Sequence, residues 1–155
     1  MTQQTKTEGK IAIHTNKSQK MTTIKLPRPL VNHILTQAQQ SPESEICGLI
    51  GGHDQNARHY YPIDNAAADQ SRRFQMNPKE QIDAMRQMRN NNEELIAIYH
   101  SHPHAPALPS VTDLNEAEYP EAAYLIISLN TIGVLEMTAF CIKDKQASEI
   151  ALELI

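Results

Sequence analysis

Two histidines separated by one residue, His100 and His102, are the strongest candidates for chemistry in this sequence. They follow the apolar run of residues 95–99, which is typical of a β-strand buried on both faces. Because side chains alternate along a strand, both imidazoles are expected on one face, roughly 6–7 Å apart along the chain. This spacing would let both rings bind one metal ion. Taken alone, the pair also fits two strand-end histidines without a metal.

Asp113 is the candidate for a third metal ligand. The segment between His102 and Asp113 contains three prolines, which restrict the conformations that a loop can adopt. Two histidines and one carboxylate are a known ligand set for catalytic zinc, with the fourth position left for water. The stretch from Ser110 to Asp113 also fits the Ser-x-x-acid pattern of a helix start. The cap and the ligand are compatible interpretations, since a helix start can present a ligand.

The order His-x-His, seven residues, Ser, two residues, Asp resembles the signature of the JAMM (MPN+) metallopeptidase family. That family carries an upstream glutamate in a segment resembling E-x-x-G-[LI]-[LI]-x-G, and the segment from Glu45 to Gly51 is similar to it. Glu45 takes the glutamate position in preference to Glu43, because only Glu45 keeps the spacing to the glycines. The resemblance extends over about residues 21–155, and residues 113–128 look like the small bacterial members in particular.

The resemblance implies the JAMM/MPN (cytidine-deaminase-like) fold and one Zn²⁺ per chain, bound by His100, His102 and Asp113. Zinc lowers the pKa of a bound water toward about 7. Glu45 would take a proton from that water and pass it to the leaving amine. Ser110 would donate a hydrogen bond to the developing oxyanion, a contribution of ~2.7–4 kcal/mol.

The family resemblance also implies a substrate. The chain is expected to be a peptidase or isopeptidase that acts after Gly-Gly in the C-terminal tail of a small ubiquitin-like or sulfur-carrier protein of the ThiS/MoaD type. Some relatives remove residues beyond that Gly-Gly, and others release a cysteine. One alternative is a non-catalytic MPN-fold scaffold, although such domains lack parts of the ligand set. A relative of the bacterial RadC group is disfavoured by Ser101, where that group has Asn.

Composition agrees with an ordinary globular protein and excludes other classes. The chain has 155 residues, of which 40% are hydrophobic and 21% charged, with a formal net charge of −4. This charge does not favour nucleic-acid binding. Cys47 and Cys141 lie in apolar runs and are expected to be buried thiols. No stretch is long enough for a membrane span and no signal peptide begins the chain, so we expect a cytoplasmic protein. A homodimer is compatible with the sequence.

The remaining sequence must form the elements that position these residues. A polar, disordered tail is expected over residues 1–20, followed by one domain over residues 21–155. Helices are predicted from Pro29 to about Ser41, from Asn77-Pro78 to about Asn90, and near 111–118. Strands are predicted at 22–26, 45–50, 59–63, 95–99, 123–129, 134–143 and 148–154. The predicted fold class is mixed α/β, a twisted and mostly antiparallel sheet with flanking helices.

Overall fold

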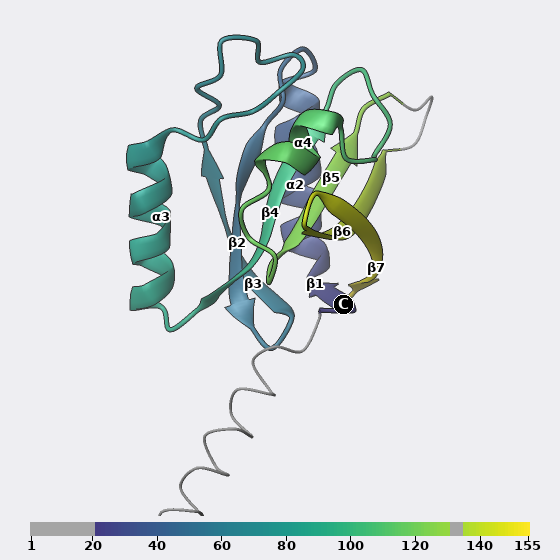
Figure 1. The fold of residues 1–155 in the computed structure, drawn as a ribbon. Helices are drawn as coiled ribbons and strands as arrows, with labels where there is room; N and C mark the ends of the chain where they lie inside the picture. Colours follow the sequence, from purple (N-terminus) through teal and green to yellow (C-terminus); the bar gives the residue numbers. More distant parts are fainter. Residues whose placement is uncertain (1–20, 131–134) are drawn as a thin grey trace, which may run out of the picture.

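The described residues form seven strands, which close on themselves as a barrel (Figure 1). This computed structural model describes residues 21–130 and 135–155. The tail predicted over residues 1–20 lies outside the described residues. In pairing order the strands are β1 (Thr23–Leu26), β3 (Asn56–Ile63), β2 (Cys47–His53), β4 (Glu94–His102), β5 (Ala123–Ser128), β6 (Glu136–Lys143) and β7 (Gln146–Leu154).

Most neighbouring strands run antiparallel. Four pairings are antiparallel (β2 with β3, β2 with β4, β5 with β6, β6 with β7), whereas β1 is parallel to both β3 and β7, and β4 is parallel to β5. β2 and β3 form an antiparallel hairpin from the strands predicted at 45–50 and 59–63. β4 lies between β2 and β5, so that Cys47 and Ile126 flank His100 on its two sides. The mixed, mostly antiparallel sheet predicted from the sequence is confirmed.

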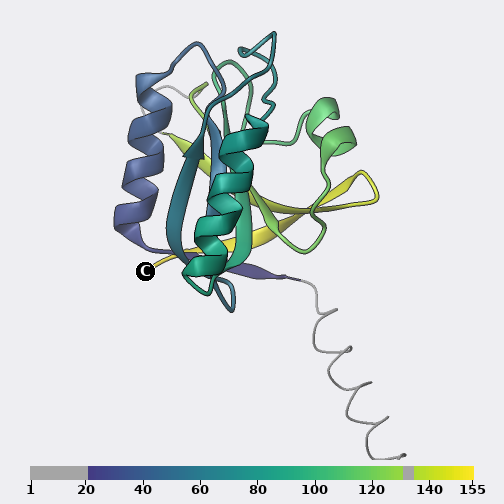
Figure 2. The ribbon, with the colours of Figure 1, turned by 90° about the vertical axis from the view of Figure 1, so that its left-hand side faces the viewer.

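Two helices cover the sheet, α2 (Arg28–Gln40) and α3 (Pro78–Asn90) (Figure 2). α2 has proline in its first turn, where no backbone donor is lost, and it buries Leu30, Val31, Ile34 and Ala38. α3 begins at Asn77, whose side chain accepts a hydrogen bond from the backbone N–H of Glu80. The short α4 (Val111–Glu116) follows β4 in the chain. Among the described residues, no helix is long and apolar enough to cross a membrane.

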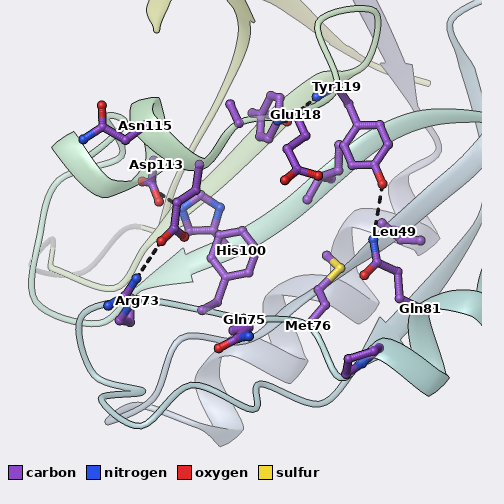
Figure 3. Close-up of a pocket in the computed structure, with 16 residues that line it drawn as sticks. Leu49, Arg73, Gln75, Met76, Gln81, His100, Asp113, Asn115, Glu118 and Tyr119 are labelled. Atoms are coloured by element: carbon purple, nitrogen blue, oxygen red, sulfur yellow. Dashed lines mark hydrogen bonds and ion pairs between the residues drawn. The ribbon is translucent and has the colours of Figure 1, made fainter.

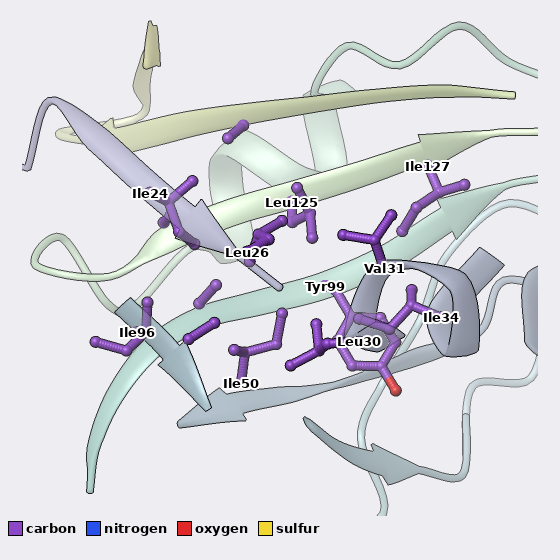
Figure 4. Packing of buried hydrophobic residues seen from close by; sticks show 14 of the residues in the cluster. Ile24, Leu26, Leu30, Val31, Ile34, Ile50, Ile96, Tyr99, Leu125 and Ile127 are labelled. Carbon is purple, nitrogen blue, oxygen red and sulfur yellow. The ribbon is translucent and has the colours of Figure 1, made fainter. Parts of the chain in front are cut away.

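The two helices pack on opposite faces of the central strands, because alternate side chains enter two separate apolar clusters. Tyr99 and Leu125 belong to the cluster beneath α2 (Figure 4), whereas Ile98 and Ile126 belong to the cluster that includes Met88 of α3. This explains the unbroken apolar run of β4, which is buried on both faces as predicted. The strand continues beyond the predicted end at residue 99 to His102. Both histidines are therefore held by the ladder of a buried strand.

Candidate metal centre

His100 and His102 occupy the end of β4 and point to the same face, as expected from the alternation of side chains along a strand. Their ring centroids lie 4.9 Å apart, and both residues are almost completely buried. The Nε2 atoms of the two rings approach to 3.1 Å. Two nitrogens that both point a lone pair at each other repel at this distance, unless a proton or a cation lies between them.

Asp113 reaches the same point from the first turn of α4. Its Oδ2 atom lies 3.1 Å from Nε2 of His100 and 3.1 Å from Nε2 of His102. The same oxygen accepts a hydrogen bond from the backbone N–H of Ser110 at 2.9 Å, and Ser110 Oγ accepts one from the backbone N–H of Asp113 at 3.0 Å. This reciprocal arrangement is a capping box. Asp113 therefore serves as a cap residue and also faces both imidazoles.

The three facing atoms fit a metal ion. They form a triangle with edges of 3.1 Å. Ligands that bind tetrahedral zinc at 2.0–2.1 Å lie roughly 3.3 Å from one another, which is close to this separation. Imidazole nitrogen and carboxylate oxygen are also the donors that zinc accepts. The fourth coordination position would remain open, which a catalytic zinc site requires and a structural zinc site does not.

The two imidazoles are oriented by different contacts. His102 Nδ1 donates a hydrogen bond to the backbone carbonyl of Pro106 at 2.8 Å, which leaves the lone pair of a neutral ring on Nε2. His100 Nδ1 has no hydrogen-bond partner among the described residues. Its ring is instead held by stacking on Phe74, with centroids 4.5 Å apart. Sequence reasoning did not identify Phe74, which comes from the loop between β3 and α3.

Glu45 precedes β2 and lies beside the histidines. One oxygen of its carboxylate and one nitrogen of each imidazole all lie within 4.8 Å of one another. The Glu45 Oε1 atom is buried and has no hydrogen-bond partner among the described residues. Asp113 contacts both rings at 3.1 Å, so Asp113 is better placed than Glu45 as the third ligand, and Glu45 is left to act on a neighbouring group.

Ser101 holds the backbone next to Glu45, a role that the sequence did not indicate. Its Oγ accepts a hydrogen bond from the backbone N–H of Ile46 at 2.8 Å, and its own N–H donates to the Ile46 carbonyl at 3.1 Å. The loop after β3 adds two further bonds, from the Glu45 N–H to Gln70 and from Asn65 to the Glu45 carbonyl. The glutamate is thus fixed to the strand that carries the histidines.

Burial and neighbouring charges set the protonation of the site. Desolvation by burial raises the pKa of Glu45 to about 8, partly opposed by His102. Desolvation likewise lowers the pKa of His100. Desolvation alone would lower the pKa of His102 and raise the pKa of Asp113, but the net shift of each pKa has the opposite direction. Hydrogen bonds to Asp113 and Pro106 raise the pKa of His102 overall, and hydrogen bonds from both histidines lower that of Asp113 overall.

His104, the other histidine of this loop, lies away from the site. It is exposed and its Nε2 atom is 3.2 Å from the Glu43 carboxylate, which is also exposed. Neither residue had been predicted as a ligand or base, and the structure brings neither to the triangle.

A cavity of about 740 Å³ opens beside the three facing atoms (Figure 3). One wall is the segment that runs from Arg73 to Gln81, and the other runs from Asp113 to Tyr124. Leu49 and Ile98 line it from the sheet. A cavity of this size, apolar at its base and with ionisable groups at one side, is the usual form of a substrate site.

Comparisons with known proteins find relatives of this chain. The family profile for prokaryotic homologues of the JAB domain matches residues 27–140. The desampylase of Haloferax volcanii is 30% identical over 102 residues, which cover 64% of this chain and 73% of that protein. The CysO-cysteine peptidase of Mycobacterium tuberculosis is 31% identical over 121 residues, 77% of this chain and 83% of the peptidase. A probable TtuB-protein conjugate cleaving protease of Thermus thermophilus is 31% identical over 127 residues, 82% and 80% of the two chains.

Solved structures show the same fold. A protein from Desulfitobacterium hafniense superposes with a TM-score of 0.76 at 33% identity, covering 85% of this chain and 92% of its own. A structure described as a JAMM metalloprotease-like zinc site in the proteasome and signalosome superposes with a TM-score of 0.54 at 16% identity, covering 86% and 99%. The second likeness concerns the fold alone.

Proposed function

The chain belongs to the family of prokaryotic homologues of the JAB domain, and on this premise we propose that it is a zinc-dependent peptidase acting on the tail of a ubiquitin-like sulfur-carrier protein. The observation that carries the proposal is the triangle of His100, His102 and Asp113, with edges of 3.1 Å, beside the unpartnered carboxylate of Glu45. Named relatives of the chain are peptidases.

His100, His102 and Asp113 would hold the zinc ion. When bound, zinc supplies a Lewis acid and makes water acidic enough to act as a nucleophile near neutral pH. Glu45 takes the proton of the attacking water and delivers it to the nitrogen of the leaving amine. A carboxylate with a pKa of about 8 holds a proton well, which suits the second step, and a nearby dication favours its ionised form for the first.

Ser110 would stabilise the tetrahedral transition state. Its Oγ accepts a hydrogen bond from the Asp113 amide, which fixes the oxygen close to the metal ligand. That bond leaves the hydroxyl proton available, and we assign this proton to the developing oxyanion. A preorganised donor of this kind contributes roughly 2.7–4 kcal/mol to catalysis.

The substrate is proposed from the relatives and from the cavity. Two relatives are named for cleaving CysO-cysteine and TtuB–protein conjugates. We propose the same class of partner, a small carrier protein that has Gly-Gly in its C-terminal tail, directly before the bond that is cut. Glycine lets a backbone approach a surface closely, and Phe74 and Leu49 are among the residues that line the cavity. We further propose a cytoplasmic location, where thiols such as Cys47 stay reduced.

The test is a cleavage assay followed by intact-protein mass spectrometry. The probe is a ubiquitin-fold carrier from the same organism, extended by one or two residues beyond Gly-Gly. The proposal predicts a product that ends at Gly-Gly, its loss after treatment with a chelator and its return with added zinc. Cleavage that persists in the demetallated enzyme, or no cleavage by zinc-loaded enzyme, would contradict it.

A further inference from the structure

Arg73 gives the cavity a feature that the proposed reaction does not use. Among the described residues that line the cavity, Arg73 alone carries a permanent positive charge, while Asp113, Glu116 and Glu118 are acidic. Its side chain is 49% exposed. An anionic group entering the cavity would be repelled by the acidic residues and attracted at this one place.

The guanidinium lies close to the proposed metal ligands. Arg73 Nη2 donates to Glu116 Oε1 at 2.6 Å, and Glu116 lies three residues after Asp113 on α4. Residues three apart on a helix are neighbours, roughly 5–6 Å between Cβ atoms. Arg73 also directly precedes Phe74, whose ring stacks on His100. In Figure 3, Arg73 lies on the side of Asp113, whereas Gln81 and Tyr119 lie on the other side of His100.

Because Glu116 and Asp113 are three positions apart on α4, roughly 5–6 Å between their Cβ atoms, the place of Arg73 suits a very short leaving segment. An extended chain advances about 3.3–3.6 Å per residue. A carboxylate one or two residues beyond a bond cut at the triangle would therefore come within reach of the Arg73 side chain. In a longer tail the C-terminal carboxylate would lie beyond the Arg73 guanidinium. The same holds for a lysine side chain that joins the carrier to a second protein.

The present partner of Arg73 is exchangeable. Glu116 is 52% exposed, and exposed ion pairs contribute only about 0–1 kcal/mol. The contact uses a single nitrogen, whereas a guanidinium can bind a carboxylate through two parallel N–H bonds. A substrate carboxylate that approaches in this way would compete successfully with Glu116.

We infer that Arg73 binds the terminal carboxylate of the leaving group, so that the enzyme prefers substrates in which one or two residues with a free C-terminus follow the scissile bond. This inference rests on the proposed function and narrows its substrate class. Hydrolysis adds water across that C–N bond, and the released amino acid or dipeptide leaves with its amine protonated. Conjugates to a protein lysine are then poor substrates.

The experiment compares two forms of one carrier. Both carry a single alanine after Gly-Gly, with a free carboxylate in one and a carboxamide in the other, introduced by ligation of a synthetic tail. We expect kcat/KM of the zinc-loaded wild type to favour the carboxylate by roughly 10- to 100-fold, as a charge-assisted bond allows. In Arg73→Gln this preference should fall to about 3-fold or less.

Two further variants guard against a general effect of substitution. Glu116→Gln removes the competing carboxylate and should raise kcat/KM for the carboxylate form about 2- to 5-fold. Arg72→Gln, a change at the adjacent exposed arginine that does not line the cavity, should keep the wild-type preference. Equal cleavage of both forms by the wild type, or an unchanged preference in Arg73→Gln, would overturn this inference alone. Cleavage of neither form by the wild type would overturn the proposed function and this inference with it.

Discussion

Asp113 Oδ2 accepts a hydrogen bond from the backbone N–H of Ser110 and also lies 3.1 Å from the Nε2 atoms of both histidines. The helix cap and the proposed metal ligand, two compatible interpretations of one sequence pattern, are therefore supplied by the same carboxylate. The cap aims the carboxylate before any metal arrives, which reduces the conformational entropy lost on binding.

The two roles of Asp113 can be separated by substitution. In Asp113→Asn the side-chain oxygen can still accept from Ser110, so α4 and the thermal stability should be retained within about 0.5 kcal/mol. The loss of negative charge should lower zinc affinity by at least 10-fold, measured by competition with a chromophoric chelator. Ser110→Ala, which keeps the carboxylate, is the matched control and should lose far less affinity. Wild-type affinity in Asp113→Asn would remove this residue from the ligand set.

Glu45→Gln should retain zinc and lose turnover. The ligands survive in this variant, but the proton acceptor does not, so kcat should fall about 10²- to 10⁴-fold. The measurements are zinc content by mass spectrometry and carrier cleavage under single-turnover conditions. Glu43→Gln, at an exposed residue paired with His104, should behave as the wild type. Activity that persists in Glu45→Gln would exclude Glu45 as the base.

Ser101→Ala tests whether the position of Glu45 depends on the strand between the histidines. The change leaves the buried N–H of Ile46 without its acceptor, which should cost about 1–3 kcal/mol of unfolding free energy in a urea titration. Zinc content should stay at the wild-type value, while kcat falls because Glu45 is less well held. Ser71→Ala, at a partly exposed serine whose hydroxyl donates to Asp69, is the control. Unchanged kcat in a destabilised Ser101→Ala would show that the bond is structural only.

The Cys47 thiol should be unreactive in the folded protein. Burial, and secondarily the Glu45 carboxylate, raise its pKa from 9.0 to about 12, and only the thiolate reacts with alkylating agents. Because the pKa of Cys47 is higher in the folded than in the unfolded protein, the contribution of this protonated thiol to the free energy of unfolding is complete below about pH 9. That contribution is lost as pH rises from 9 toward 12. Iodoacetamide at pH 8 should modify Cys47 only in urea, as read by peptide mass spectrometry. Rapid labelling without denaturant would contradict this burial.

The sequence indicated the proposed ligands because their positions depend on short-range rules. The period of two along β4 places His100 and His102 on one face, and the Ser-x-x-Asp pattern places Asp113 in the first turn of a helix. The element types were predictable for the same reason, although β4 extends further than its apolar run. Residues 131–134, which include the start of the strand predicted from residue 134, lie outside the described residues.

Long-range contacts were not predictable from these patterns. Ser101 and Ile46 are 55 positions apart, and no local signal connects them. The same applies to Phe74 against His100, and to the parallel pairing of β1 with β7 that closes the barrel. Sequence patterns identify which segments form strands, but they do not identify the neighbour with which each strand pairs. Every strand exposes equivalent backbone N–H and C=O groups.

Zinc content of the purified protein, compared with the double variant His100→Ala/His102→Ala, tests the central claim most directly. Both proteins would be purified without chelators and dialysed against zinc, and circular dichroism would verify that the variant is folded. The account predicts about one zinc per chain in the wild type and none in the folded variant. Equal zinc in both proteins, or no zinc in the wild type after incubation, would contradict the site and the peptidase mechanism built on it.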